Sequence, residues 1–371
     1  MANGKALVIA VQTGIPVLVW GRPGTGKTSF INMFVDVIGR WLETVIASIR
    51  EPSDFAGLPI ITSDDTVNLA APSWVKRIIE KKEKENISSV VFLDEISTAP
   101  PAVQAALLRP TFEGAVGDEQ LPDDVWFIAA ANPVDTSSGT WTLSAALANR
   151  FIHIDWDVDM LAWVEGMQNG FKMDGAIDIL PDDWEDTLPQ FRTLISSFIK
   201  ARPALLLKQP DNTDESGKAW PSPRTWDNAS RVLAACRSVN LDKNTTLNLI
   251  AGCIGPGPAS EFFNWEKELD LPDPETLLAN PDAFKVPTKG DVTFAILSSV
   301  VTAAKGNLTK QRWNAAWKIL GIAATAQKAD IAAIPAKTLA KARKDGDKKK
   351  LAVPRDVKAF VPVLEKAGLL G

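Results

Sequence analysis

The stretch Gly-Arg-Pro-Gly-Thr-Gly-Lys-Thr-Ser-Phe at residues 21–30 constrains the fold most, because it follows directly on the apolar run of residues 16–20. Its spacing, Gly21-x-x-x-x-Gly26-Lys27-Thr28, is the P-loop pattern. Glycines let the backbone wrap tightly, so that successive N–H groups point into one concavity that suits phosphate. A helix predicted near residues 28–38 turns the positive end of its dipole toward the same anion. The alternative is a glycine-rich turn with a solvent-exposed lysine, and the strand before the loop and the helix after it disfavour that interpretation.

This loop supplies most of the predicted nucleotide contacts. We expect Lys27 to reach the β- and γ-phosphates and the Thr28 hydroxyl to hold Mg²⁺. The residues predicted to bind the nucleotide are Gly21, Pro23, Gly24, Thr25, Gly26, Lys27, Thr28 and Ser29.

Strand and helix signals alternate along the first 155 residues. Apolar, β-rich runs at 16–20, 44–49, 89–93, 125–131 and 151–154 are separated by segments with helical spacing. This pattern is typical of a parallel sheet with crossover helices. The predicted fold class is therefore α/β, a P-loop αβα sandwich with a five-stranded parallel sheet in domain 1–155. Mostly helical segments follow, which we divide into a helical lid domain (156–270), a proline- and aspartate-rich connector (271–290) and a helical C-terminal extension (291–371).

The composition narrows the classes of protein that fit. The chain has 371 residues, of which 46% are hydrophobic, and its formal net charge of −5 disfavours wrapping around nucleic acid. No apolar run approaches the ~20 residues of a membrane-spanning helix. Cys236 and Cys253 lack metal-site spacing, and Met1–Val11 does not resemble a signal peptide, so we expect a cytoplasmic protein with free thiols. His153 lies within an apolar strand, where we expect a structural role.

Two carboxylates end the apolar run of residues 89–93. A buried parallel strand delivers its last side chains to the sheet edge where ligands bind. Asp94 therefore suits the Mg²⁺ shell, and Glu95 suits the base that polarises an attacking water. Capping of the next helix is the alternative role for this pair.

The run of residues 126–131 ends at Asn132, the next candidate at the same edge. An asparagine there can orient a water between Glu95 and the γ-phosphate. The alternative is a simple turn residue before Pro133.

Two arginines are further candidates. Arg150 ends the predicted helix of residues 143–150 and precedes a strand, so it could satisfy the helix dipole or reach the γ-phosphate of a neighbouring subunit. Ser222 and Pro223 open a helix as cap and first residue, which puts Arg224 in the first turn. Cations are disfavoured at that end of a helix, so a phosphate-gripping role would explain Arg224.

Together, the P-loop, Leu93-Asp94-Glu95, the strand-end Asn132, Asn149-Arg150-Phe151 and Ser222-Pro223-Arg224 resemble the AAA+ ATPases. More narrowly they resemble the MoxR-like branch, which includes relatives of dynein and of the McrB restriction motor. Predicted hairpins at 58–70 and 113–121 lie where this branch carries insertions. The resemblance covers residues 1–240, and the C-terminal 80 residues carry no motif of the family.

The resemblance implies hydrolysis of ATP with Mg²⁺ by a homo-oligomeric ring, usually a hexamer, that remodels or matures a protein partner. Such a partner is often a protein with a von Willebrand factor A domain, and hairpin 58–70 would engage the substrate near the pore. The implied catalytic residues are Glu95, Asn132, Arg150 as the arginine finger, and Arg224, while Thr28 and Asp94 would hold the metal. Whether Arg224 acts on its own subunit or on a neighbour stays open at this point.

Two alternatives remain. One is a slow, nucleotide-gated assembly component of a larger particle, such as a phage-tail-like injection system or a gas vesicle. The other is a nucleic-acid motor, which the acidic balance disfavours and which finds support only in the basic segment 337–350.

Overall fold

The computed structural model describes residues 2–133, 141–171, 178–269, 271–342, 351 and 360. The chain forms two compact units, one of Met1–Glu185 with Leu205–Glu261 and the other of Asp186–Ala204 with Phe262–Gly371. Residues of the segment 156–270, which the sequence assigns to one helical domain, are divided between the two units. The division at residues 155, 270 and 290 therefore stays a prediction.

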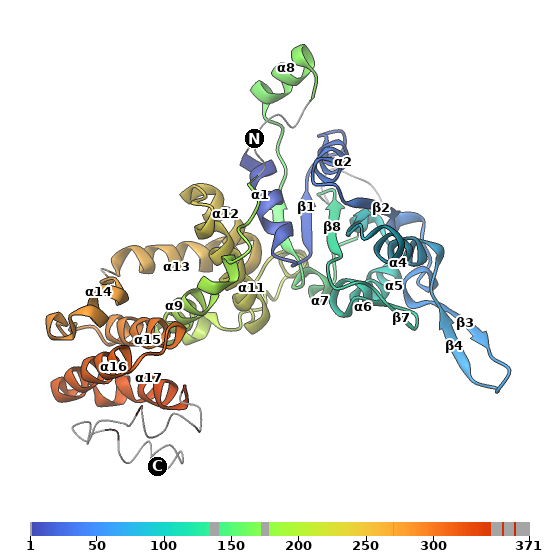
Figure 1. Ribbon diagram of the computed structural model, residues 1–371. Helices are drawn as coiled ribbons and strands as arrows, with labels where there is room; N and C mark the ends of the chain where they lie inside the picture. Colours follow the sequence, from blue (N-terminus) through green and yellow to red (C-terminus); the bar gives the residue numbers. More distant parts are fainter. Residues whose placement is uncertain are drawn as a thin grey trace. The chain divides into compact units, whose positions relative to one another are not determined.

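The first unit is built on a five-stranded parallel sheet with the strand order β2-β5-β8-β1-β9 (Figure 1). The strands are β1 (Val17–Trp20), β2 (Trp41–Ile46), β5 (Ser89–Asp94), β8 (Trp126–Ala131) and β9 (Ile152–Asp155). The helices before and between them are α1 (Ala2–Gln12), α2 (Lys27–Val37), α3 (Ser53–Ala56), α4 (Ser73–Glu85), α5 (Pro101–Ala106), α6 (Leu108–Glu113) and α7 (Ala145–Ala148). This arrangement confirms the predicted P-loop αβα sandwich.

Helices cover the sheet from both sides, so its inner strands are apolar on both faces. Leu18, Val91 and Leu93 share one apolar cluster with residues of α3, α4, α5 and α7. On β1, Val17 and Val19 alternate with Leu18 and are also fully buried. Burial on both faces is typical of a parallel sheet and explains the continuous apolar runs in the sequence.

The strand predicted at 44–49 instead runs from Trp41 to Ile46, and residues 47–49 form a 3₁₀ turn. The charged Glu43 interrupts the apolar pattern, so the sequence does not indicate that this strand begins at Trp41. Its carboxylate is buried and ion-paired with Arg77 on α4, at 2.5 Å. A buried charge is tolerated when it is paired in this way.

Both predicted hairpins are present. The first pairs β3 (Leu58–Ile61) with β4 (Val67–Ala70), and the second pairs β6 (Ala115–Val116) with β7 (Glu119–Gln120). The backbone of Asp118 donates to Leu69 O at 2.9 Å, and its carboxylate accepts from Leu69 N at 2.6 Å. The turn of the second hairpin is therefore fastened to the base of the first.

The first unit continues after the sheet with α8 (Met160–Asn169), α10 (Thr213–Ser216), α11 (Pro223–Ser238) and α12 (Lys243–Ile254). Ser222 is the N-cap of α11 and Pro223 lies in its first turn, as predicted, and Thr225 completes a capping box with Ser222. Helix α12 contacts β9 closely at Gly252, where a Cβ atom would lie 2.0 Å from His153 O.

The second unit is helical, with α9 (Leu188–Ala201), α14 (Pro274–Ala279), α15 (Gly290–Gly306), α16 (Lys310–Ala323) and α17 (Ala329–Lys341), and α13 (Pro256–Glu268) crosses its boundary. Trp313 and Trp317 pack edge to face in its core, 5.8 Å between ring centroids. Helix α14 lies within the predicted connector 271–290 and buries Leu277 and Leu278 in that core. The basic segment 337–350 is helical as far as Lys341, and its residues 343–350 lie outside the described residues. None of the helices in the described ranges is long and apolar enough to span a membrane.

Candidate functional site

The loop between β1 and α2 has the backbone that its glycines predict. Gly24 and Gly26 adopt left-handed conformations, with φ of +78° and +83°. Gly26 is also the N-cap of α2, where it offers no side chain to the first turn. Because the first N–H groups of a helix have no partner within it, this N-terminus is open to an external acceptor such as phosphate.

Trp156 lies one residue beyond β9 and supports this loop through two contacts. It was not among the predicted residues. Its indole N–H donates to Thr25 O at 3.1 Å, and its ring packs on Phe30 of α2 with centroids 4.9 Å apart. A Cβ at Gly21 would lie 2.8 Å from Trp156 O, so the first position of the motif must be glycine. In the sequence, Trp156 is marked only by its position after a predicted strand. That position alone does not reveal its contact with the loop.

Lys27 is a buried cation with three neutral acceptors. Its ammonium donates to Gly21 O at 2.6 Å, to Arg22 O at 3.1 Å and to Asn132 Oδ1 at 3.2 Å. Burial lowers the pKa of Lys27, and the nearby charge of Asp94 opposes this shift. A phosphate oxygen in place of a carbonyl would supply the missing negative charge, so the site fits the predicted anion.

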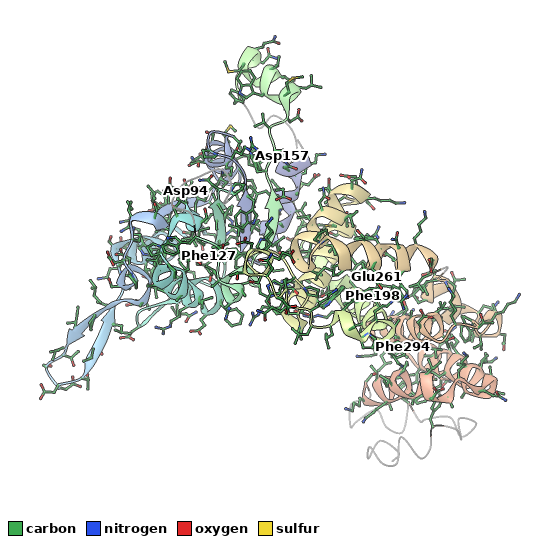
Figure 2. The ribbon with its side chains drawn as sticks, turned by 180° about the vertical axis from the view of Figure 1, so that it is seen from behind. Asp94, Phe127, Asp157, Phe198, Glu261 and Phe294 are labelled. Carbon is green, nitrogen blue, oxygen red and sulfur yellow. The ribbon has the colours of Figure 1, made fainter. Side chains whose placement is uncertain are left out.

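Thr28 and Asp94 form the candidate metal site. Thr28 Oγ1 and Asp94 Oδ2 are 3.4 Å apart, and Asp94 Oδ1 accepts from the Glu95 backbone at 2.9 Å. Asp94 ends β5 (Figure 2). Burial raises the pKa of Asp94, with a further contribution from the charge of Glu95. Hydroxyl and carboxylate oxygens are the donors that Mg²⁺ prefers, so the pair fits the predicted ion.

Glu95 stands at a strained backbone position, with φ of +58°. Its Oε2 accepts from Ser48 Oγ at 2.6 Å, and its side chain makes no capping bond to the next 3₁₀ turn, so capping does not explain it. Ser48 follows β2, the strand next to β5, and was not predicted. The contact between Ser48 and Glu95 depends on β2 and β5 being neighbours in the sheet, and the sequence does not show this.

Asn132 lies beside the loop, as predicted. Its side-chain oxygen accepts from Lys27, and its backbone N–H donates to Ser97 Oγ at 3.1 Å. The structure thus brings Lys27, Thr28, Asp94 and Asn132 together at the carboxyl ends of β1, β5 and β8, with Glu95 next to Asp94.

Arg150 and Arg224 instead lie against the same aromatic side chain. Their guanidinium carbons lie 4.8 Å and 5.0 Å from the ring centroid of Phe112 on α6. Asn149 fixes this arrangement, because its side chain accepts from Ser222 Oγ at 2.8 Å and donates to Trp220 O at 3.2 Å. In the described part of the chain, no hydrogen bond or ion pair links either arginine to residues 21–29.

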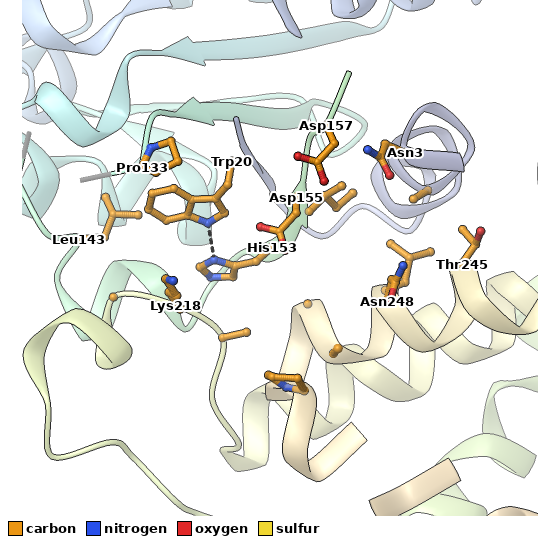
Figure 3. A pocket seen from close by; sticks show the side chains of 18 of the residues that line it. Asn3, Trp20, Pro133, Leu143, His153, Asp155, Asp157, Lys218, Thr245 and Asn248 are labelled. Atoms are coloured by element: carbon orange, nitrogen blue, oxygen red, sulfur yellow. Dashed lines mark hydrogen bonds between the residues drawn. The ribbon is translucent and has the colours of Figure 1, made fainter. Parts of the chain in front are cut away.

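A cavity of about 710 Å³, within the size range of ligand pockets, borders this sheet edge on the side of α1 and α12 (Figure 3). His153 lies on its wall, where Nδ1 accepts from the Trp20 indole at 2.9 Å and Nε2 contacts Ala148 O at 2.9 Å. Burial lowers its pKa from 6.5 to about 4. Both ring nitrogens are engaged, which agrees with the structural role expected for this residue.

Of the comparisons with known proteins, the family model agrees with this geometry. Residues 16–153 match the family model "ATPase family associated with various cellular activities (AAA)". The match spans the parallel sheet and the P-loop, Asp94-Glu95 and Asn132 positions, and it supports an AAA+ ATPase domain in the first unit. No curated protein matches the chain. Among solved structures, a "putative ATPase" from Cytophaga hutchinsonii is similar, at 19% identity and a TM-score of 0.44, over 67% of this chain and 79% of that chain.

Proposed function

We propose that this chain is a MoxR-like AAA+ ATPase that hydrolyses ATP with Mg²⁺, assembles into a ring and remodels, matures or assembles a protein partner. The observation that carries the ATPase part is the position of Lys27, which bonds the loop after β1 and Asn132 after β8. A lysine that only bordered a glycine-rich turn would have no reason to be buried there.

The loop residues bind the phosphates in this proposal. Lys27 exchanges its carbonyl acceptors for β- and γ-phosphate oxygens, while the N–H groups of the loop and of the first turn of α2 hold the remaining oxygens. Thr28 and Asp94 hold Mg²⁺, which would supply charge stabilisation to the phosphates.

Glu95 and Asn132 act on water. Glu95 accepts a proton from the attacking water, and Asn132 positions that water from the neighbouring strand end. Ser48 occupies one acceptor site of the carboxylate, and the remaining lone pairs of Glu95 are available to the water.

Both arginines act across a subunit interface in this proposal. Arg150 and Arg224 share the ring of Phe112, and Asn149 and Ser222 fasten their two segments together. This shared position favours a common target for the two arginines, the γ-phosphate of the neighbouring subunit, and so it favours action of Arg224 in trans.

The β3–β4 hairpin is the candidate contact for a protein partner, for which a protein with a von Willebrand factor A domain is our first candidate. Leu58, Ile60, Ile61 and Val67 are each more than half exposed on it. A nucleotide-gated assembly role in a larger particle would use the same surface with slower turnover. Nucleic acid is the least favoured partner, given the net charge of −5.

Two variants test the core of the proposal. Lys27→Ala should weaken ATP binding in calorimetry, because the positive contact to the phosphates is lost. Glu95→Gln should bind ATP normally and hydrolyse it ~10²–10⁴-fold more slowly, as expected for loss of a general base. Unchanged affinity in the first variant, or wild-type turnover in the second, contradicts the proposed site.

A further inference from the structure

Phe112 joins the two candidate arginines and has no other assigned role. It lies on α6, three positions before the hairpin β6–β7, and its side chain is 56% exposed. The guanidinium groups of Arg150 and Arg224 both approach its ring, at 4.8 Å and 5.0 Å. A ring this exposed contributes little to the core, so core packing does not account for its position.

Holding two arginines together is unfavourable without compensation. Burial lowers the pKa of Arg150, the charge of Arg224 adds to this shift, and the charge of Glu113 opposes part of it. The negative face of an aromatic ring attracts each guanidinium and offsets part of this repulsion. Phe112 can therefore hold the two cations near each other before an anion arrives.

The arginine pair retains capacity to bind an anion. One terminal nitrogen of Arg150 donates to Ala146 O at 2.6 Å. One donor of Arg150 is therefore used on a carbonyl of the short helix α7. Its Nε is buried and has no acceptor among the described residues. A buried donor without a partner is costly, and a phosphate oxygen would remove that cost.

We propose that Phe112 is a positioning residue for Arg150 and Arg224, and that its ring holds both guanidinium groups ready for the γ-phosphate of a nucleotide in a neighbouring subunit. The inference rests on the proposed function, since that function supplies the phosphate across the interface. It adds a residue that contacts neither the nucleotide nor the attacking water.

A substitution series at Phe112 separates the role of the ring from that of apolar volume. Phe112→Ala and Phe112→Leu should lower the kcat for ATP hydrolysis by about tenfold, the size expected from losing ring–guanidinium contacts. Phe112→Trp should keep the wild-type kcat. The affinity of the unassembled subunit for ATP should not change, because its P-loop is untouched. Ile334→Ala is the control for loss of an exposed apolar side chain, since Ile334 on α17 is also 56% exposed.

Mixing experiments assign the defect to one side of the interface. Phe112→Ala subunits mixed with Lys27→Ala subunits should recover activity, because hybrid interfaces pair an intact loop with an intact arginine side. Phe112→Ala mixed with Arg150→Ala should recover none, because both lack a working arginine side. Recovery in the second mixture, or wild-type kcat in both Phe112→Ala and Phe112→Leu, overturns the inference and leaves the proposed function standing. If Lys27→Ala and Arg150→Ala subunits co-assemble without recovery, the trans role and this inference are both wrong.

Assembly gives a readout that does not depend on turnover. In sedimentation velocity, a non-hydrolysable ATP analogue with Mg²⁺ should promote association of the wild-type chain at lower protein concentration than of Phe112→Ala. Association without nucleotide should be the same for both. Equal nucleotide-dependent association of the two proteins contradicts the positioning role.

Discussion

Ser48 donates a hydrogen bond to Glu95 Oε2 over 2.6 Å, although the two residues are 47 positions apart in the chain. They meet because β2 and β5 are neighbours in the sheet, with Ile46 paired to Asp94 at the shared strand ends. The candidate base is therefore held by a side chain from outside the motif that contains it. A shift at the end of β2 that moves Ser48 would therefore alter this hydrogen bond and the position of the Glu95 carboxylate.

Ser48→Ala should release Glu95 and raise the basal rate of ATP hydrolysis by about tenfold or more, because a hydrogen bond to a charged group contributes ~1.5–3 kcal/mol. ATP affinity should stay the same, since Ser48 has no contact with the loop among the described residues. Ser48→Thr keeps the hydroxyl and is the control. Steady-state ATPase assays measure the effect, and a lower rate in Ser48→Ala would mean that the hydrogen bond orients the base productively.

His153 is the single histidine of the chain, so its protonation can be followed without signals from other imidazoles. His153 is buried and its pKa is lowered by burial from 6.5 to about 4, so as the pH falls the unfolded chain takes up the proton first. The stability of the first unit should therefore decrease by about 1.4 kcal/mol per pH unit between 6.5 and 4, and it should not depend on His153 above that window.

Two measurements check this expectation. NMR of ¹³C-labelled histidine should show one imidazole that stays neutral down to about pH 4, in keeping with its buried environment. Urea unfolding between pH 7 and pH 5 should lose most of its slope in His153→Asn, which takes up no proton. An imidazole titrating near its ordinary value would show that the site is open to water.

The sequence allowed the sheet and the P-loop side of the site to be predicted, because local signals specify them. Apolar runs mark strands that are buried on both faces, and Gly24 and Gly26 occupy backbone conformations that favour glycine. Asp94 and Asn132 could be placed because every parallel strand delivers its last residues to the same edge.

The remaining contacts depend on which elements become neighbours. Ser48, Trp156 and Phe112 carry no motif, and each acts on a residue far from it in the chain. Their roles follow from the strand order and from the position of α6, which no local pattern specifies.

Trp156→Phe should weaken ATP binding without unfolding the domain. The phenyl ring still packs on Phe30, but the hydrogen bond to Thr25 O is lost and the loop becomes less fixed. We expect a loss of affinity of about three- to tenfold, corresponding to one hydrogen bond. Calorimetric titration with ATP gives the affinity, and thermal unfolding gives the control. Equal affinity for both proteins would show that the loop does not need this support.

Gly117→Ala should separate the two hairpins. Gly117 has φ of +60°, and an added Cβ would lie 2.3 Å from Leu69 O. Gly39→Ala is the matched control, since Gly39 has φ of +66° and no atom within 4 Å of the added Cβ. Backbone strain alone should cost about 1 kcal/mol in both variants. The additional clash should lower the unfolding free energy of Gly117→Ala further, and equal stabilities would show that the hairpins can move apart freely.

The exposed face of the first hairpin should be needed for partner-dependent activity and not for folding. Ile60, Ile61 and Val67 are exposed by 53%, 77% and 59%, beyond the point where Leu69 is fastened to Asp118. Changing all three to threonine keeps β-branched side chains, so the strands should persist while the apolar surface is lost. Thermal unfolding, ATP affinity and basal hydrolysis should match those of the wild type, because none of these side chains contributes to the core.

Stimulation of ATP hydrolysis should distinguish the proposed partner role from a purely structural one. With the von Willebrand factor A protein encoded beside this chain, where one is present, stimulation should fall to the basal level in the triple variant. Val37→Thr, an exposed apolar residue at the end of α2, is the control for a general change in surface polarity. A collapsed thermal transition in the triple variant would show that the hairpin supports the fold. Undiminished stimulation would show that the partner binds elsewhere, because an apolar contact of this size cannot be lost at three positions without weakening binding.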